Sequence, residues 1–339
     1  AVATFETMFA AYLGGGHCVG VNSGTDALAL ACRAVGLPPG GEVLTVSMTS
    51  PATATAIAMA GCVPRFVDVS AVTRCIRLDR VSAAIGPQTV AIMPVHLHGQ
   101  PADMPGLMAL ASARGLAVIE DCAQAHGATI GGRKVGTFGH AAAFSFYPTK
   151  NLGGVGDGGA VITSDAAVAD RVRVLRTYGW RGSERSSTVV GVNSRLQEIQ
   201  AAILSVLLPH LDSGTAERAR IASHYRQALG PLAVAGRIGL PPEAEGAAYH
   251  QFAIEVSDRD GVRDRLARMG VGTGVHYAVP VHRQPAFAPY LPPEASLPVT
   301  DALAGRLVSL PIQPEVVGEA AGDIAGRVID AVSASRAVA

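Results

Sequence analysis

The sequence predicts an α/β fold in which a large domain, built on a mainly parallel sheet with helices on both faces, precedes a smaller C-terminal α/β domain. Short β-rich segments recur between longer helix-like segments, which is the pattern of βα units. Most of these short segments are continuously apolar, as expected for strands covered by helices on both faces. Because the pattern changes near residue 195, we expect a large domain over residues 1–210 and a small one over residues 211–339.

Seven segments are predicted to be strands of one doubly wound sheet in the large domain. In chain order they are residues 17–23, 42–48, 63–69, 90–97, 115–121, 141–147 and 159–164. Ligands of such sheets bind beyond the carboxyl ends of the strands, so the residues that follow these strands are the first candidates for a site.

The second half of the chain is predicted to be helix-rich. Residues 194–229 have helical apolar spacing over a length unusual for one helix, and Pro209 is expected to kink or split it. A loop rich in glycine and proline is expected from residue 230. A strand over 249–257 and helices near 259–270 and 316–335 are expected to complete the small domain.

Composition limits the classes of partner. The 339 residues carry 27 basic and 27 acidic side chains, which argues against nucleic acid or a membrane surface and favours a small, roughly neutral partner. No uninterrupted apolar run reaches the roughly 20 residues that span a bilayer. The five cysteines form no CxxC pair and have no histidines at zinc-finger spacing, so we expect a cytoplasmic protein and no metal site.

Lysine is rare in this chain, since Lys134 and Lys150 are the only two among its 27 basic residues. Lys150 follows a predicted strand and precedes a glycine-rich segment in which the backbone can approach a ligand. A partly neutral lysine amine can form a Schiff base with a carbonyl, and burial among Phe144, Phe146 and Tyr147 would lower its pKa accordingly. The alternative is an exposed loop lysine, which is what we expect of Lys134.

Two further motifs follow predicted strands. Asp121 and the residue before it end a hydrophobic strand, where one carboxylate can pair with the ring nitrogen of pyridoxal phosphate (PLP) or instead cap the next helix. Ser23, Gly24 and Thr25 precede a helix, where they can bind a phosphate or act as ordinary capping residues. An amine, a carboxylate and an anion site on the loops of one sheet together favour PLP as the cofactor.

Six motifs in order along almost the whole chain resemble the DegT/DnrJ family of sugar aminotransferases. They are NSGTDAL, PVHLHGQPADM, VIEDCAQAHGA, FSFYPTKNLGGVGDGGAV, GVNSRLQEIQAAIL and GTGVHYAVPVHRQPAF. The resemblance implies the aspartate-aminotransferase-like fold (PLP fold type I), PLP as the cofactor and a homodimer with shared active sites.

Carried over by position, the resemblance implies that Lys150 is the Schiff-base lysine and proton carrier and that Asp121 pairs with the pyridine nitrogen. Gln124 would lie against the ring and its phenolic oxygen. The phosphate would be held by residues from two subunits, namely Gly24, Thr25 and Ser145 of one and Asn193 of the other, with Arg195 a weaker candidate. Turn and strand roles are the alternatives for Asn193 and Ser145.

Substrate contacts are expected from Tyr147 beside the lysine and from His276 and Tyr277 in the loop that the family places at the cleft. His96 and His98 follow a strand and rank with them, although a lone histidine is more often structural.

Two departures from the family pattern matter. Ser50 or Ala52 stands where members usually carry an aromatic residue that stacks on the cofactor. The chain begins at Ala1 rather than Met, so we expect that a leading segment, which often contributes to the substrate site, is missing.

The function that we expect is transfer of an amino group from an amino acid, glutamate or glutamine, to a nucleotide-linked keto-sugar in amino-sugar or antibiotic biosynthesis. A keto-cyclitol acceptor is the alternative within the family. Lys150 argues against the dehydratase branch, which has histidine in its place. A non-catalytic regulator built on the same fold is the alternative from another class.

Overall fold

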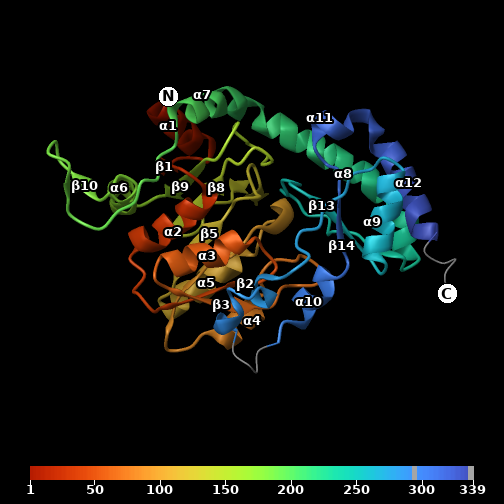
Figure 1. The fold of residues 1–339 in the computed structure, drawn as a ribbon, viewed down its shortest axis with the longest axis horizontal. Helices are drawn as coiled ribbons and strands as arrows, with labels where there is room; N and C mark the ends of the chain where they lie inside the picture. The colour runs from red at the N-terminus through yellow and green to blue at the C-terminus, as the bar shows by residue number, and fades with distance from the viewer. Residues whose placement is uncertain (292–295, 335–339) are drawn as a thin grey trace.

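A seven-stranded sheet forms the centre of the larger part of the molecule (Figure 1). The computed structural model describes residues 1–291 and 296–334. In spatial order the strands are β1 (His17–Val21), β9 (Gly159–Thr163), β8 (Ala141–Ser145), β5 (Ala117–Asp121), β4 (Thr89–Ile92), β2 (Glu42–Val46) and β3 (Val63–Val67). All seven predicted strands are therefore present in one sheet, and the mainly parallel α/β fold is confirmed.

Strand β9 is the exception in direction, because it is antiparallel to both of its neighbours. The other strand pairs of this sheet are parallel. Parallel neighbours need a long crossover, usually a helix, and no helix lies between β8 and β9, only the glycine-rich segment after Lys150. That short connection accounts for the reversed strand.

Helices cover both faces of the large sheet. They are α1 (Val2–Tyr12), α2 (Gly24–Val35), α3 (Pro51–Met59), α4 (Leu78–Ala84), α5 (Met104–Arg114) and α6 (Ala166–Leu175). The pleat of β8 shows how the two faces are separated: Ala141 and Ala143 join the core under α2 and α6, whereas Ala142 and Phe144 join the core that includes α1.

The long helical segment is divided as predicted at Pro209. Helix α7 (Glu198–Leu207) is followed by a 3₁₀ turn over Leu208–His210 and then by α8 (Leu211–Val234). Helix α8 continues through Pro231, so the loop expected from residue 230 begins later than predicted. In Figure 1, α8 runs from the large sheet across to the second, smaller sheet.

The smaller sheet has three antiparallel strands in the order β12 (Ile238–Gly239), β13 (Phe252–Val256) and β14 (Leu307–Leu310). Its core is shared with α8, α9 (Arg259–Arg268) and α12 (Ala321–Ser333), and a short helix α11 (Pro314–Val317) precedes α12. The helices expected near 259–270 and 316–335 are therefore present.

The segment between β13 and β14 returns to the large sheet. Asp68, just after β3, accepts hydrogen bonds from the backbone N–H groups of Val299 and Thr300 in α10 (Pro298–Ala304). Val281 packs in one core with Phe66. The domain boundary at residue 210 stays a prediction, and this contact ties chain from beyond it to the large sheet.

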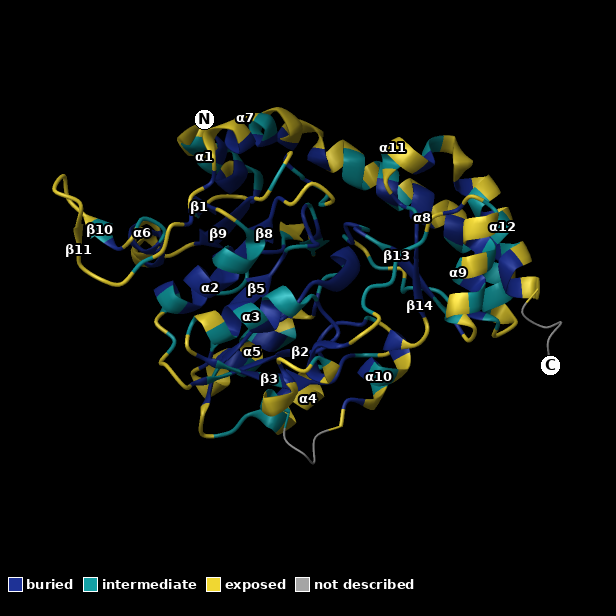
Figure 2. Cartoon of the chain, viewed as in Figure 1, coloured by how far each residue is buried: buried dark blue, intermediate teal, exposed yellow. Residues whose placement is uncertain are grey.

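Burial follows this architecture, since the strands of the large sheet are buried and the hairpin β10 (Trp180–Arg181) and β11 (Ser186–Ser187) projects outward with exposed residues (Figure 2). A second hairpin pairs β6 (Thr129–Ile130) with β7 (Arg133–Lys134). Within the described ranges, no helix is both long and apolar enough to span a membrane.

Candidate active site

A cavity of about 260 Å³ lies where the carboxyl ends of β5 and β8 meet the N-terminus of α2. It is lined by Ser23, Gly24, Thr25, Leu28, Thr49, Ser50, Ala52, Val95, Asp121, Ala123, Gln124, Ser145, Tyr147, Lys150, Asp157 and Tyr277. Eight of the residues predicted from the sequence thus lie around one cavity, although they come from distant parts of the chain.

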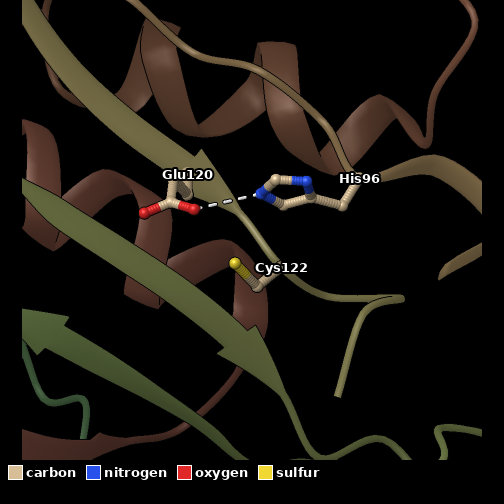
Figure 3. Close-up of side chains that lie close together, drawn as sticks. All are labelled: His96, Glu120 and Cys122. Atoms are coloured by element: carbon tan, nitrogen blue, oxygen red, sulfur yellow. Dashed lines mark hydrogen bonds and ion pairs between the residues drawn. The ribbon is translucent and has the colours of Figure 1, made fainter. Parts of the chain in front are cut away.

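The two acidic residues at the end of β5 face opposite sides of the sheet, because successive side chains of a strand alternate. Asp121 faces the cavity, and Glu120 faces away from it. Figure 3 shows the Glu120 carboxylate with His96 and Cys122. The strand-end motif alone leaves open which of the two carboxylates serves the site, whereas the family resemblance implies Asp121, and Asp121 is the one that lines the cavity.

Glu120 is fully buried and anchors the loop before β8. Its carboxylate accepts hydrogen bonds from the backbone N–H groups of Gly136, Phe138 and Gly139 at 2.7–2.8 Å. Nδ1 of His96 accepts from the Ala102 N–H, so its Nε2 carries the proton and donates to Glu120 at 3.2 Å (Figure 3). His96 is thereby engaged away from the cavity.

Three potential metal ligands, on His96, Glu120 and Cys122, lie within 4.8 Å of one another. The Glu120 oxygens already accept four hydrogen bonds, and burial raises the pKa of the Cys122 thiol well above its ordinary value. Cys122 is a small, fully buried side chain, and the group as a whole fixes the end of β5.

Asp121 is 4% exposed and accepts one hydrogen bond on each carboxylate oxygen. Oγ1 of Thr53 donates to Oδ2 at 2.8 Å, and the backbone N–H of Ala123 donates to Oδ1 at 3.1 Å. Burial raises the pKa of Asp121, while these two bonds and the positive charge of Lys150 oppose the rise. The carboxylate is therefore held in a fixed orientation beside the amine.

Lys150 lies in the loop after β8, and burial lowers the pKa of its amine, with the negative charge of Asp121 opposing the shift. The predicted direction is confirmed, but the surroundings are not as expected. Phe146 packs edge-on against Phe5 in the core under α1, and Tyr147 is 50% exposed. In the described part of the chain, Nζ of Lys150 has no hydrogen-bond or ion-pair partner, so it is available to a ligand.

The expected phosphate site lies at the N-terminus of α2. Oγ of Ser23 caps the helix by accepting from the Asp26 N–H, which leaves Gly24 and Thr25 in the first turn. A Cβ at Gly24 would lie 2.7 Å from the Cβ of Ser145, so glycine is what allows the helix to approach the end of β8. Backbone N–H groups and hydroxyls at a helix N-terminus favour an anion.

A hydrogen-bonded network holds two residues of the lining, Gln124 and Tyr277. Oε1 of Gln124 accepts from the backbone N–H of His98 at 2.6 Å, and its Nε2 donates to the Tyr277 hydroxyl at 3.1 Å. Burial, with the charge of Asp121, raises the pKa of Tyr277 to about 12, so its hydroxyl stays protonated. Nε2 of His98 donates to the carbonyl of His276. Tyr277 is thus positioned by a closed set of contacts.

Five candidate residues are not part of the lining of this cavity: His96 and His98, described above, and His276, Asn193 and Arg195. His276 lines a neighbouring cavity of about 390 Å³, and its Nδ1 lies 2.9 Å from Oγ of Ser309. Asn193 and Arg195 line another cavity, where Nε of Arg195 donates to Oδ1 of Asn193. Asn193 and Arg195 are expected to contribute to the site of a second subunit. That they do not line the cavity of their own chain is compatible with this expectation, which stays a prediction.

Sequence reasoning missed several residues. Thr49, Thr53 and Asp157 escaped notice because hydroxyl and acidic residues are common, and only the fold brings them to the cavity or to Asp121. Lys134, expected to be a solvated loop residue, is partly exposed at the end of β7, and its Nζ pairs at 2.9 Å with Asp212, which lies 78 positions away along the chain.

The residues around the cavity fit PLP. A carboxylate for the ring nitrogen, an amine for the carbonyl and a helix N-terminus with hydroxyls for the phosphate converge on one space. The close approach that Gly24 permits brings the hydroxyl of Ser145 beside that helix. Ser50 and Ala52 are confirmed as small residues in the lining, where the aromatic residues are Tyr147 and Tyr277.

Comparisons with known proteins agree with the cavity. Residues 1–329 match the model of the DegT/DnrJ/EryC1/StrS aminotransferase family. The erythromycin biosynthesis sensory transduction protein EryC1 of Saccharopolyspora erythraea is 46% identical over 323 residues, which cover 94% of this chain and 87% of that protein. A dTDP-3-amino-3,4,6-trideoxy-alpha-D-glucose transaminase of Streptomyces venezuelae is 46% identical over 330 residues, which cover 97% of this chain and 85% of that protein.

A solved structure is similar over nearly the same length. The X-ray structure of S. venezuelae DesV in complex with a ketimine intermediate superimposes with a TM-score of 0.92 at 45% identity, and the match covers 98% of this chain and 88% of that one. The family depends on PLP, which confirms the expected cofactor. By its fold, its length of match and its sequence, the chain belongs to the DegT/DnrJ/EryC1/StrS aminotransferase family.

Proposed function

We propose that the chain transfers an amino group from an amino acid, glutamate or glutamine, to a nucleotide-linked keto-sugar, with PLP held in the cavity at the ends of β5 and β8. The observation that carries the proposal is that Lys150 and Asp121 line this cavity together with the first turn of α2. The S. venezuelae relative, named as a dTDP-amino-sugar transaminase, supports the substrate class.

Four residues are proposed to hold the cofactor. Gly24, Thr25 and Ser145 offer N–H groups and hydroxyls to the phosphate, and Asp121 pairs with the ring nitrogen. When bound, PLP supplies a carbonyl that takes up an amine and a ring that accepts the electron pair released at the substrate carbon. Asp121 keeps the ring electron-poor because its carboxylate stabilises the positive charge on the nitrogen.

Lys150 is proposed to bind the cofactor carbonyl between turnovers and to move a proton at Nζ during each half-reaction. A general base has to be neutral to accept a proton, and burial lowers the pKa of this amine in that direction. The lack of a hydrogen-bond partner for Nζ in residues 1–291 and 296–334 leaves the amine free to reach the substrate carbon.

Gln124, Tyr147 and Tyr277 are proposed to orient the sugar and the cofactor ring, with His276 contributing from the neighbouring cavity. Oε1 of Gln124 and one of its N–H bonds are already used within the protein, so one N–H of its amide remains for a ligand. The Tyr277 hydroxyl accepts from Gln124 and is also hydrogen-bonded to the side chain of Ser50, so both residues hold it at the cavity.

The active form is proposed to be a homodimer in which Asn193 reaches the phosphate of the other subunit, with Arg195 beside it. The position of both residues in a separate cavity of their own chain supports this arrangement. We also propose a cytoplasmic location, supported by five cysteines that are all buried and free of disulfides.

A substrate screen tests the proposed activity. Protein loaded with PLP is incubated with glutamate or glutamine and with dTDP-linked or UDP-linked keto-sugars, and keto-cyclitols form a parallel set. Amination of a nucleotide-linked sugar supports the proposal, whereas amination of cyclitols alone selects the alternative acceptor. A protein that takes up PLP but aminates none of these compounds favours the regulator, and the relative EryC1 is named as a sensory transduction protein.

A further inference from the structure

We propose that Thr53 is a positioning residue for Asp121, and that the hydrogen-bond chain from Thr49 through Thr53 keeps the Asp121 carboxylate ionised and turned toward the cavity. The inference rests on the proposed role of Asp121 as the partner of the cofactor ring nitrogen. Thr53 itself does not line the cavity and acts through Asp121.

The polarity of the hydrogen-bond chain follows from chemistry. A carboxylate can only accept, so the single proton of the Thr53 hydroxyl is committed to Oδ2 of Asp121 at 2.8 Å. Oγ1 of Thr49 lies 3.0 Å from Oγ1 of Thr53, and with the Thr53 proton already committed, Thr49 is the donor of that contact. Two hydroxyls therefore point in one direction, and each bond polarises the next.

The position of Thr53 is fixed by the start of α3. Ser50 caps this helix, Pro51 occupies its first turn, and the Thr53 N–H bonds to the Ser50 carbonyl at 3.3 Å. Thr53 is fully buried, and a β-branched side chain in a helix has few rotamers. The hydroxyl therefore reaches Asp121 without much loss of side-chain freedom.

Asp121 needs such donors because it is buried in a mixed electrostatic environment. Burial favours the neutral form of Asp121. The Asp121 charge also raises the pKa values of Tyr277 and Cys122, so these two groups remain neutral and do not stabilise the Asp121 carboxylate by an opposite charge. The positive charge of Lys150 favours the ionised form. Among the residues that the structure describes, Thr53 is the one side chain that donates a hydrogen bond to this carboxylate.

The test uses three matched variants and PLP as the probe. Thr53→Val removes the hydroxyl and keeps the shape, Thr53→Ser keeps the hydroxyl, and Thr55→Val makes the same change two residues away on α3. The dissociation constant of PLP and the pH dependence of the visible absorbance of the loaded protein are measured for each. Both are repeated in the Asp121→Asn background.

We expect Thr53→Val to weaken PLP binding about tenfold, as the loss of a hydrogen bond to a charged group would, and to shift the pH dependence of the absorbance. Thr53→Ser and Thr55→Val should match the wild type. In the Asp121→Asn background, Thr53→Val should have no further effect, because its partner charge is gone. Should Thr53→Val fail to fold, Thr49→Val, which removes the donor to Thr53, is expected to give the same change in smaller measure.

Wild-type binding and an unaltered pH profile in Thr53→Val would overturn the inference, as would an equal loss in the Asp121→Asn background. A wild-type chain that takes up no PLP would overturn the proposed function instead. In that case carbon NMR of the Asp121 carboxyl decides: a raised pKa in Thr53→Val supports the role of Thr53, and an unchanged pKa refutes it.

Discussion

Replacing Glu120 with glutamine tests the anchor behind the site. The carboxylate is fully buried and accepts three backbone N–H bonds and one from Nε2 of His96. Each Glu120 oxygen accepts two hydrogen bonds. The NH₂ group of a glutamine, which can only donate, would therefore face two N–H groups, and both of those hydrogen bonds would be lost. Removing one partner of such a buried set costs about 3–5 kcal/mol, which is a large share of the roughly 5–15 kcal/mol by which domains are stable.

Urea unfolding at neutral pH measures the loss, and Glu184→Gln is a matched control because Glu184 is exposed. The control should change the free energy of unfolding by less than about 0.5 kcal/mol. A loss below about 1 kcal/mol in Glu120→Gln would refute the reasoning.

The pH dependence of stability gives an independent check on Glu120. Burial alone would raise its pKa, but the bonds from His96, Gly139 and Gly136 outweigh burial and lower the pKa below the ordinary 4.5. The carboxylate therefore stabilises the folded state at neutral pH, and this contribution is lost as the pH falls below 4.5. The Glu120→Gln variant should lack that part of the acid-induced loss.

Three further predictions concern the cavity itself. Lys150→Ala should abolish amino transfer without lowering the melting temperature, because burial disfavours the charged amine; residual turnover in that variant would contradict its assignment. Asp121→Asn should retain some PLP by visible absorbance yet lose most turnover, about 100-fold for a charge-assisted contact of about 3 kcal/mol, and full turnover would point to another ring partner. Co-refolding Lys150→Ala with Asn193→Ala should restore about one quarter of wild-type activity. Half of the dimers then contain one chain of each variant, and each mixed dimer has one intact site out of two. A mixture that recovers no activity would argue against shared sites.

Much of the site was predictable because its key residues follow strands within recognisable motifs. Lys150 after β8 and Gly24 after β1 were identified from strand endings and from glycine-rich or capping residues, and both line the cavity. The split at Pro209 was predictable because proline cannot donate the backbone hydrogen bond that a continuous helix needs.

Other features depend on which distant residues the fold brings together. Glu120 and Asp121 are adjacent in sequence, and only the pleat and register of β5 decide that Asp121 faces the cavity. Thr53 and Asp121 are 68 positions apart, so their hydrogen bond has no local signature. Lys134 resembled a turn residue, yet α8 supplies Asp212 as its partner.

Reduction with borohydride followed by peptide mass spectrometry tests the central claim most directly. The chain contains only two lysines, so a reduced covalent link to PLP can be assigned without ambiguity. We predict that the peptide containing Lys150 carries the cofactor mass and that the peptide containing Lys134 does not. Labelling of Lys134 in place of Lys150, or of neither residue in PLP-treated protein, would contradict the account.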